Sequence, residues 1–93
     1  MAAAGSRPAV IRGTVLTGSG EPLVGARVYF VRGPVALPDI AALTGEDGSF
    51  VLSAPAAGEY EIGAAADGFA PSEVSVRVAE ADTARVTLHL AAQ

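Results

Sequence analysis

Residues 44–62, TGEDGSFVLSAPAAGEYEI, contain two short alternating stretches separated by turn residues. Asp47-Gly48 in this segment predicts a hairpin, because Asp and Gly tolerate the positive φ angles of tight turns. Apolar residues alternate with polar ones after the turn and again after a loop at 54–58. The inward-facing residues are Phe50 and Leu52 in the first stretch and Tyr60 and Ile62 in the second. This period of two predicts strands with one buried face.

The same pattern extends outward over most of the 93 residues. Alternating stretches are separated by turn signals about every 8–12 residues, a spacing typical of sandwiches and barrels. We expect strands at residues 9–16, 25–31, 40–44, 49–53, 59–66, 73–79 and 83–90. Alanine-rich segments favour helix by propensity but are too short to form one alone. The sequence therefore predicts an all-β, seven-stranded antiparallel Greek-key β-sandwich at residues 9–91, after a flexible N-terminal lead-in at 1–8.

Short motifs follow one another in a set order between residues 11 and 90. They are Ile11-x-Gly13-x-Val15, Gly25-Ala26-x-Val28, Thr44-x-x-Asp47-Gly48-x-Phe50, Gly58-x-Tyr60-x-Ile62, Asp67-Gly68-Phe69 and Val86-x-Leu88-x-Leu90. Together they resemble the carboxypeptidase regulatory-like domain family. The resemblance implies a transthyretin-like β-sandwich. It also implies an accessory module that is usually appended to peptidases, transporters or surface proteins.

We interpret the motif residues as folding residues with no reactive role. The glycines permit tight turns and close strand approach, with Gly25 expected to avoid a clash with the neighbouring sheet. Tyr60 is expected to bury its ring and to pair its hydroxyl group at an edge. The structural turn and core set is Gly25, Asp47, Gly48, Phe50, Gly58, Tyr60, Gly68 and Phe69.

Composition excludes several kinds of chemistry. The chain has no Cys, no Lys and a single histidine, His89, on an alternating outward face. Disulfides, thiolate metal sites, Schiff bases and multi-histidine centres are therefore absent. Turn carboxylates at Glu46, Asp47 and Asp67 are too sparse for the dense acidic loop that calcium requires. We expect no catalytic residue, no cofactor and no metal, and hence not an enzyme.

Charge and hydropathy limit the partners. The net charge is −4 and the six basic residues, all arginine, are scattered singly. Nucleic acids and anionic membranes both require clustered basic residues, so neither is expected. No segment approaches the ~20 apolar residues of a membrane helix, and no secretory signal is evident. We expect a cytoplasmic protein as written, or an extracellular one if the chain is a trimmed fragment.

A protein partner remains the favoured class. The candidate interface comprises Tyr29, Val31, Arg32, Val35 and Leu37, on a strand and the following loop at 32–39. Tyr, Arg and exposed apolar residues are typical of interfaces. The domain would then be a small adaptor or assembly subunit, binding a partner or itself through this loop or its edge strands.

Two alternatives stay open. Residues 32–39 fold back to cap the core if the domain is a passive structural spacer, which predicts that Val35 and Leu37 are both buried. A carbohydrate-binding module of starch-binding-like fold would need exposed aromatic rings, and Tyr29 is the single outward-facing candidate.

Overall fold

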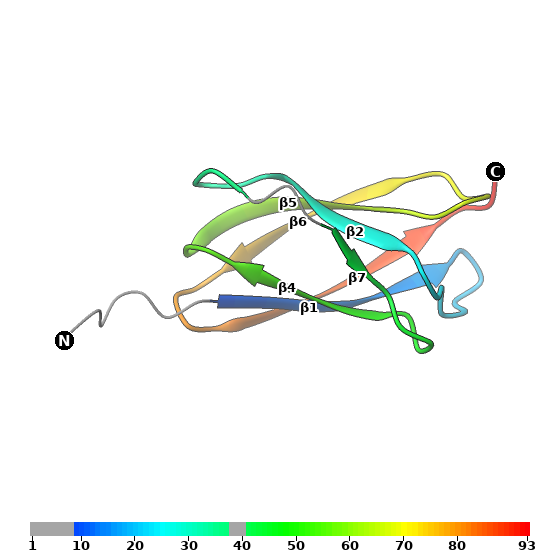
Figure 1. The fold of residues 1–93 in the computed structure, drawn as a ribbon, viewed down its shortest axis with the longest axis horizontal. Helices are drawn as coiled ribbons and strands as arrows, with labels where there is room; N and C mark the ends of the chain where they lie inside the picture. The colour runs from blue at the N-terminus through cyan, green and yellow to red at the C-terminus, as the bar shows by residue number, and fades with distance from the viewer. Residues whose placement is uncertain (1–8, 38–40) are drawn as a thin grey trace.

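The computed structural model describes residues 9–37 and 41–93, which form two β-sheets packed face to face (Figure 1). The strands are β1 (Ala9–Thr17), β2 (Arg27–Arg32), β3 (Ala41–Leu43), β4 (Ser49–Ala54), β5 (Gly58–Ala65), β6 (Ser72–Val78) and β7 (Thr83–Leu90). The seven-stranded sandwich is confirmed. The described residues contain no helix, and hence none that is long and apolar enough to cross a membrane. The expected lead-in at 1–8 and residues 38–40 lie outside the described residues.

One sheet has the strand order β4-β1-β7 and the other has the order β3-β2-β5-β6. Every pair is antiparallel except β1 and β7, which run parallel from Val10↔Thr83 to Thr17↔Leu90. The expectation of antiparallel pairing throughout was wrong for this pair. The chain returns from β6 to the first sheet and places β7 beside β1. Alternation along a strand carries no information on the direction of its neighbour.

The core lies between the sheets and follows the predicted alternation. In β4 each second residue is buried, namely Phe50, Leu52 and Ala54. Tyr60 is 1% exposed, and its hydroxyl group donates to the Ala56 carbonyl and accepts from the Ala56 amide at 3.0 Å. This ring was expected to be buried with its hydroxyl satisfied at an edge, and the geometry agrees with that expectation.

The Asp47-Gly48 turn differs from the expected hairpin. It connects β3 to β4, which belong to different sheets, so it joins the two layers. Asp47 Oδ1 accepts from the Ser49 amide at 3.1 Å and from Ser49 Oγ at 2.6 Å. Gly48 has φ +77°, and its carbonyl accepts from the Val15 amide at 2.8 Å. The turn is therefore tight, as predicted, but it docks on β1.

Gly25 and Gly68, two other predicted turn residues, have positive φ angles but different contacts. A Cβ at Gly25 would meet nothing within 4 Å, so the expected clash with the neighbouring sheet was wrong. Gly25 is required instead by its φ of +75°. Gly68 carries φ +84°, and its carbonyl accepts from the Gln93 amide at 2.9 Å. The adjacent Phe69 is half-buried against the core, next to this C-terminal contact.

Candidate functional site

Tyr29 lies on the outer surface of β2, where its side chain faces away from the core. Its register partner on β5 is Gly63, and a Cβ at Gly63 would lie 2.7 Å from Tyr29 Cε1. The ring therefore covers the glycine and is half-buried against the β5 backbone. This contact holds the aromatic ring on the sheet surface, as aromatic residues do beside strand glycines.

A β-bulge follows at Val31. Pairing with β5 passes from Phe30↔Ile62 directly to Arg32↔Glu61, which leaves Val31 as the extra residue. Val31 is 37% exposed and lies beyond the last register pair of β2 with β3, Tyr29↔Ala41. Bulges redirect side chains in this way.

Arg32 faces outward after the bulge. Its Nε lies 3.1 Å from Glu61 Oε1, and most of the arginine side chain is exposed. Exposed ion pairs of this kind contribute about 0–1 kcal/mol. The pair therefore orients Arg32 at the surface more than it stabilises the fold.

Residues 33–37 fold back over one end of the core. A Cβ at Gly33 would lie 2.7 Å from Tyr60 Cδ2, and a Cβ at Gly58 would lie 2.8 Å from Pro34 Cγ. Leu37 is half-buried and packs against the core cluster. Val35 is 45% exposed. The two loop residues thus differ, with Leu37 capping the core and Val35 facing solvent.

Sequence reasoning missed Leu43 on the neighbouring strand. Leu43 is 67% exposed and is the register partner of Arg27, on the outer face of β3. Ala41 occupies the equivalent outward position opposite Tyr29. The alternation of residues 40–44 is compatible with an outward Leu43. The predicted strand is short and mostly apolar, however, so its alternation alone does not single out Leu43. We call Tyr29, Val31, Arg32, Val35 and Leu43 the β2–β3 surface.

The residues considered for catalysis or metal binding lie apart. His89 is exposed on β7, in the three-stranded sheet. Asp67 Oδ1 lies 3.8 Å from Arg27 Nη2, and Asp47 binds Ser49. The hydrogen bonds from the Ser49 side chain and backbone lower the pKa of Asp47. Within residues 9–37 and 41–93, no group of three His, Cys, Asp or Glu side chains could hold a metal ion.

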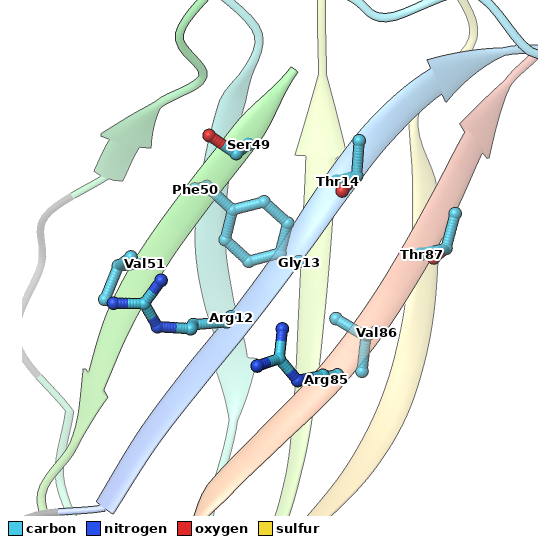
Figure 2. A pocket seen from close by; sticks show the side chains of 9 residues that line it. All are labelled: Arg12, Gly13, Thr14, Ser49, Phe50, Val51, Arg85, Val86 and Thr87. Carbon is cyan, nitrogen blue, oxygen red and sulfur yellow. The ribbon is translucent and has the colours of Figure 1, made fainter. Parts of the chain in front are cut away.

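A depression of about 270 Å³ lies on the outer face of the three-stranded sheet (Figure 2). Its lining comes from all three strands and includes two arginines, Arg12 and Arg85, with hydroxyl groups from Thr14, Ser49 and Thr87. Nothing in the sequence pattern singles out these five residues as a site. They are far apart in the chain and become neighbours only through the pairing of β1 with β4 and β7.

A family model for the carboxypeptidase regulatory-like domain matches residues 10–91. The chain belongs to this family. The match spans all seven strands, so the family assignment and the observed sandwich rest on the same residues. No curated protein matches the domain in sequence.

Solved structures that share the fold have diverse descriptions. Hydroxyquinol 1,2-dioxygenase from Pseudomonas putida DLL-E4 matches with TM-score 0.71 and 12% identity, over 100% of this chain and 59% of its own. The minor pilin GBS52 from Streptococcus agalactiae matches with TM-score 0.65 and 16% identity, over 96% and 45%. A putative carbohydrate binding protein (PA1324) from Pseudomonas aeruginosa matches with TM-score 0.62 and 16% identity, over 91% and 90%.

These likenesses show the fold alone, because an enzyme, a pilin and a described carbohydrate binder share it. The chain spans about half the length of the dioxygenase and pilin chains that it matches. A function for the regulatory-like domain has to be argued from its own surface.

Proposed function

We propose that the domain is a non-catalytic interaction module that docks a partner protein through the β2–β3 surface. The observation that carries this proposal is the exposure of Val31, Val35 and Leu43 on β2, its following loop and β3. Leu43 lies opposite Arg27 at the start of β2, and Val31 and Val35 lie at and beyond its end, so the apolar side chains extend along the strand. Exposed apolar side chains together with tyrosine and arginine are typical of protein interfaces. The partner it fits is a folded protein with an apolar patch and a carboxylate positioned to reach Arg32.

Burial of the remaining motif residues supports the non-catalytic part of the proposal. Phe50, Tyr60 and Gly48 are buried, and the other motif glycines form turns. Family membership also supports a non-catalytic role, since carboxypeptidase regulatory-like domains resemble accessory modules. The matched fold occupies only part of the dioxygenase and pilin chains, which is consistent with a module appended to a larger protein.

A passive spacer is the first competing function. It requires Val35 and Leu37 both to be buried, and Val35 is 45% exposed. Only Leu37 packs against the core, which leaves the Val35 side chain accessible to a partner.

Carbohydrate binding is the second competing function, and the description of the P. aeruginosa protein raises it. The five aromatic residues of the chain are all described, and Phe50 and Tyr60 are buried while Phe30 and Phe69 pack against the core. Tyr29 is the one outward ring, and it lies against Gly63. A single ring fixed in this way is a poor platform for stacking a sugar chain.

The test compares a Val35→Ser/Leu43→Ser variant with the wild-type domain in affinity capture from lysate of the native cells. A partner identified by mass spectrometry is then purified and titrated against both proteins. A control, Val24→Ser, changes a valine that is 63% exposed and lies outside this surface. Leu37→Ser serves as a stability marker, expected to lower the free energy of unfolding by about 1–3 kcal/mol.

We expect the purified partner to bind the wild type and the control equally and the Val35/Leu43 variant at least tenfold more weakly. The variant should keep its free energy of unfolding within about 0.5 kcal/mol, because the altered side chains are exposed. Equal binding by the Val35/Leu43 variant would refute the proposed surface. Equal weakening in the control would show that general surface hydrophobicity is responsible.

A further inference from the structure

The outer face of the three-stranded sheet is positively charged in a domain whose net charge is negative. The three strands β1, β4 and β7 contain no Asp or Glu. Their outward side chains include Arg12, Thr14, Ser49, Val51, Ser53, Thr83, Arg85, Thr87 and His89. The acidic residues of the described chain lie instead on the other sheet or in turns. This separation of charge distinguishes the two faces of the sandwich.

Arg12 and Arg85 are direct register partners across the parallel pair β1–β7. Both are exposed, and Figure 2 shows the Arg12 side chain extending towards Val51 on β4 and the Arg85 side chain extending towards β1. Neighbouring strands lie about 4.8 Å apart, so the two like charges start from adjacent backbone positions. Like charges at opposed positions destabilise a sheet.

The arginines of the four-stranded sheet follow the opposite rule. Arg27 lies 3.8 Å from Asp67, and Arg32 lies 3.1 Å from Glu61. Arg77 is the register partner of Glu59. Each of these arginines therefore faces a carboxylate. Across residues 9–37 and 41–93, neither Arg12 nor Arg85 forms an ion pair or has an acidic register partner. Arg77 forms no ion pair there either, but its register partner is acidic.

The two guanidinium groups border the depression of about 270 Å³, together with the hydroxyl groups of Thr14 and Thr87. The Ser49 hydroxyl group also lines it but already donates to Asp47. Guanidinium forks and hydroxyl groups are hydrogen-bond donors suited to oxyanions, and arginine binds carboxylates in bidentate fashion. Val51, 48% exposed, supplies an apolar wall. We propose that this depression is a carboxylate-binding site, which receives an acidic side chain from a segment of a partner protein.

The charge and shape favour a carboxylate over a polyanion. Two positive charges balance one or two carboxylates, whereas nucleic acids and anionic membranes engage wide basic surfaces. Val51 can cover the methylene groups of a glutamate side chain. The site lies on the three-stranded sheet, whereas the β2–β3 surface lies on the other sheet. The test of carboxylate binding is therefore independent of the docking proposed for the β2–β3 surface.

The test is an NMR titration of the ¹⁵N-labelled domain with N-acetyl-tetraglutamate at about 10 mM salt, where screening is weak. Inorganic phosphate is the second probe. The variant Arg12→Gln/Arg85→Gln is compared with a control of equal charge, Arg27→Gln/Arg77→Gln, on the other sheet. Thermal unfolding of each variant checks folding.

We expect glutamate peptide to shift the amide signals of Gly13, Thr14, Val86 and Thr87. The Arg12/Arg85 variant should bind at least about tenfold more weakly, because hydrogen bonds to charged groups are lost. The Arg27/Arg77 control should bind within about twofold of wild type. The Arg12/Arg85 variant should also melt at or above the wild-type temperature, since like-charge repulsion is removed.

Three results would overturn the proposal. One is an absence of binding by the wild type at millimolar peptide. Another is equal weakening in the control, which would show attraction to net charge alone. The third is phosphate binding at least tenfold tighter than the peptide in the same depression, which would assign the site to a phosphate-bearing ligand.

Discussion

Replacement of Thr44 by valine tests whether one buried hydroxyl group fixes residues 23–26, which lead into β2. Thr44 is 4% exposed. Its Oγ1 accepts from the Ala26 amide at 2.8 Å and donates to the Leu23 carbonyl at 2.5 Å. The backbone groups of Thr44 also pair with Gly25 and Ala26 at 3.0 Å. The side chain therefore fixes the segment that leads into β2.

Valine keeps the shape of threonine but leaves the Ala26 amide and the Leu23 carbonyl without their partner. An unsatisfied buried group costs about 1–3 kcal/mol, and the part-buried Leu23 carbonyl lies at the low end of that range, so the two together should cost about 2–4 kcal/mol. A domain of this size has about 5–14 kcal/mol of stability in total. The variant should still fold, with its melting temperature lowered by about 10–25 °C.

Urea unfolding followed by circular dichroism measures this change, with Thr44→Ser as the matched control. Serine keeps the hydroxyl group and should retain most of the stability lost in the valine variant. The dependence of free energy on urea should be unchanged, since the fold is the same. The reasoning fails if the valine variant lies within about 0.5 kcal/mol of wild type. It also fails if serine is as destabilising as valine.

Two further predictions concern the first sheet and its turn. Gly13→Ala should destabilise the domain by about 1–3 kcal/mol, because the new Cβ would meet the Val86 carbonyl and lie 2.7 Å from Phe50 Cζ. Gly18→Ala, where a Cβ meets nothing within 4 Å, should be neutral in the same unfolding assay. Asp47 should titrate below its ordinary pKa, because Ser49 donates a side-chain and a backbone hydrogen bond to its carboxylate. Its contribution to stability is therefore present above about pH 4 and is lost as the pH falls through the lowered pKa. An NMR titration should show that pKa rising in Ser49→Ala, and an unchanged value would exclude the side-chain hydrogen bond as its main cause.

The strands could be read from the sequence because their signals are local. The predicted strand at 83–90 has the observed bounds of β7, and the β4 alternation placed Phe50 and Leu52 inward as found. Period-two patterning depends on which face each residue presents, and a single strand contains that information. The inward positions of the aromatic core residues followed from it.

The features that could not be predicted from the sequence depend on contacts between distant segments. The Asp47-Gly48 turn has the residues of a hairpin, yet it joins two sheets because β3 pairs with β2 and β4 pairs with β1. The loop residues Val35 and Leu37 look alike in sequence, and only the position of the loop over Tyr60 separates them. Turn chemistry specifies a local path, while the choice of partner strand is decided by the whole core.

The same limit explains why the arginine pair escaped notice. Arg12 and Arg85 are 73 positions apart and appear as isolated charges in the sequence. The parallel pairing of the first and last strands places them in register and creates a charged site from two scattered residues. The outer surfaces of the two sheets therefore differ in chemistry. On β2 and β3 apolar side chains are exposed, and the β2 arginines form ion pairs with carboxylates. On β1 and β7 the two arginines lie in register, and neither forms an ion pair within the described residues. The domain thus has two faces, and each face is suited to contact a partner of its own. Because the altered residues lie on opposite sheets, the Val35/Leu43 and Arg12/Arg85 variants should act additively on any assembly that uses both.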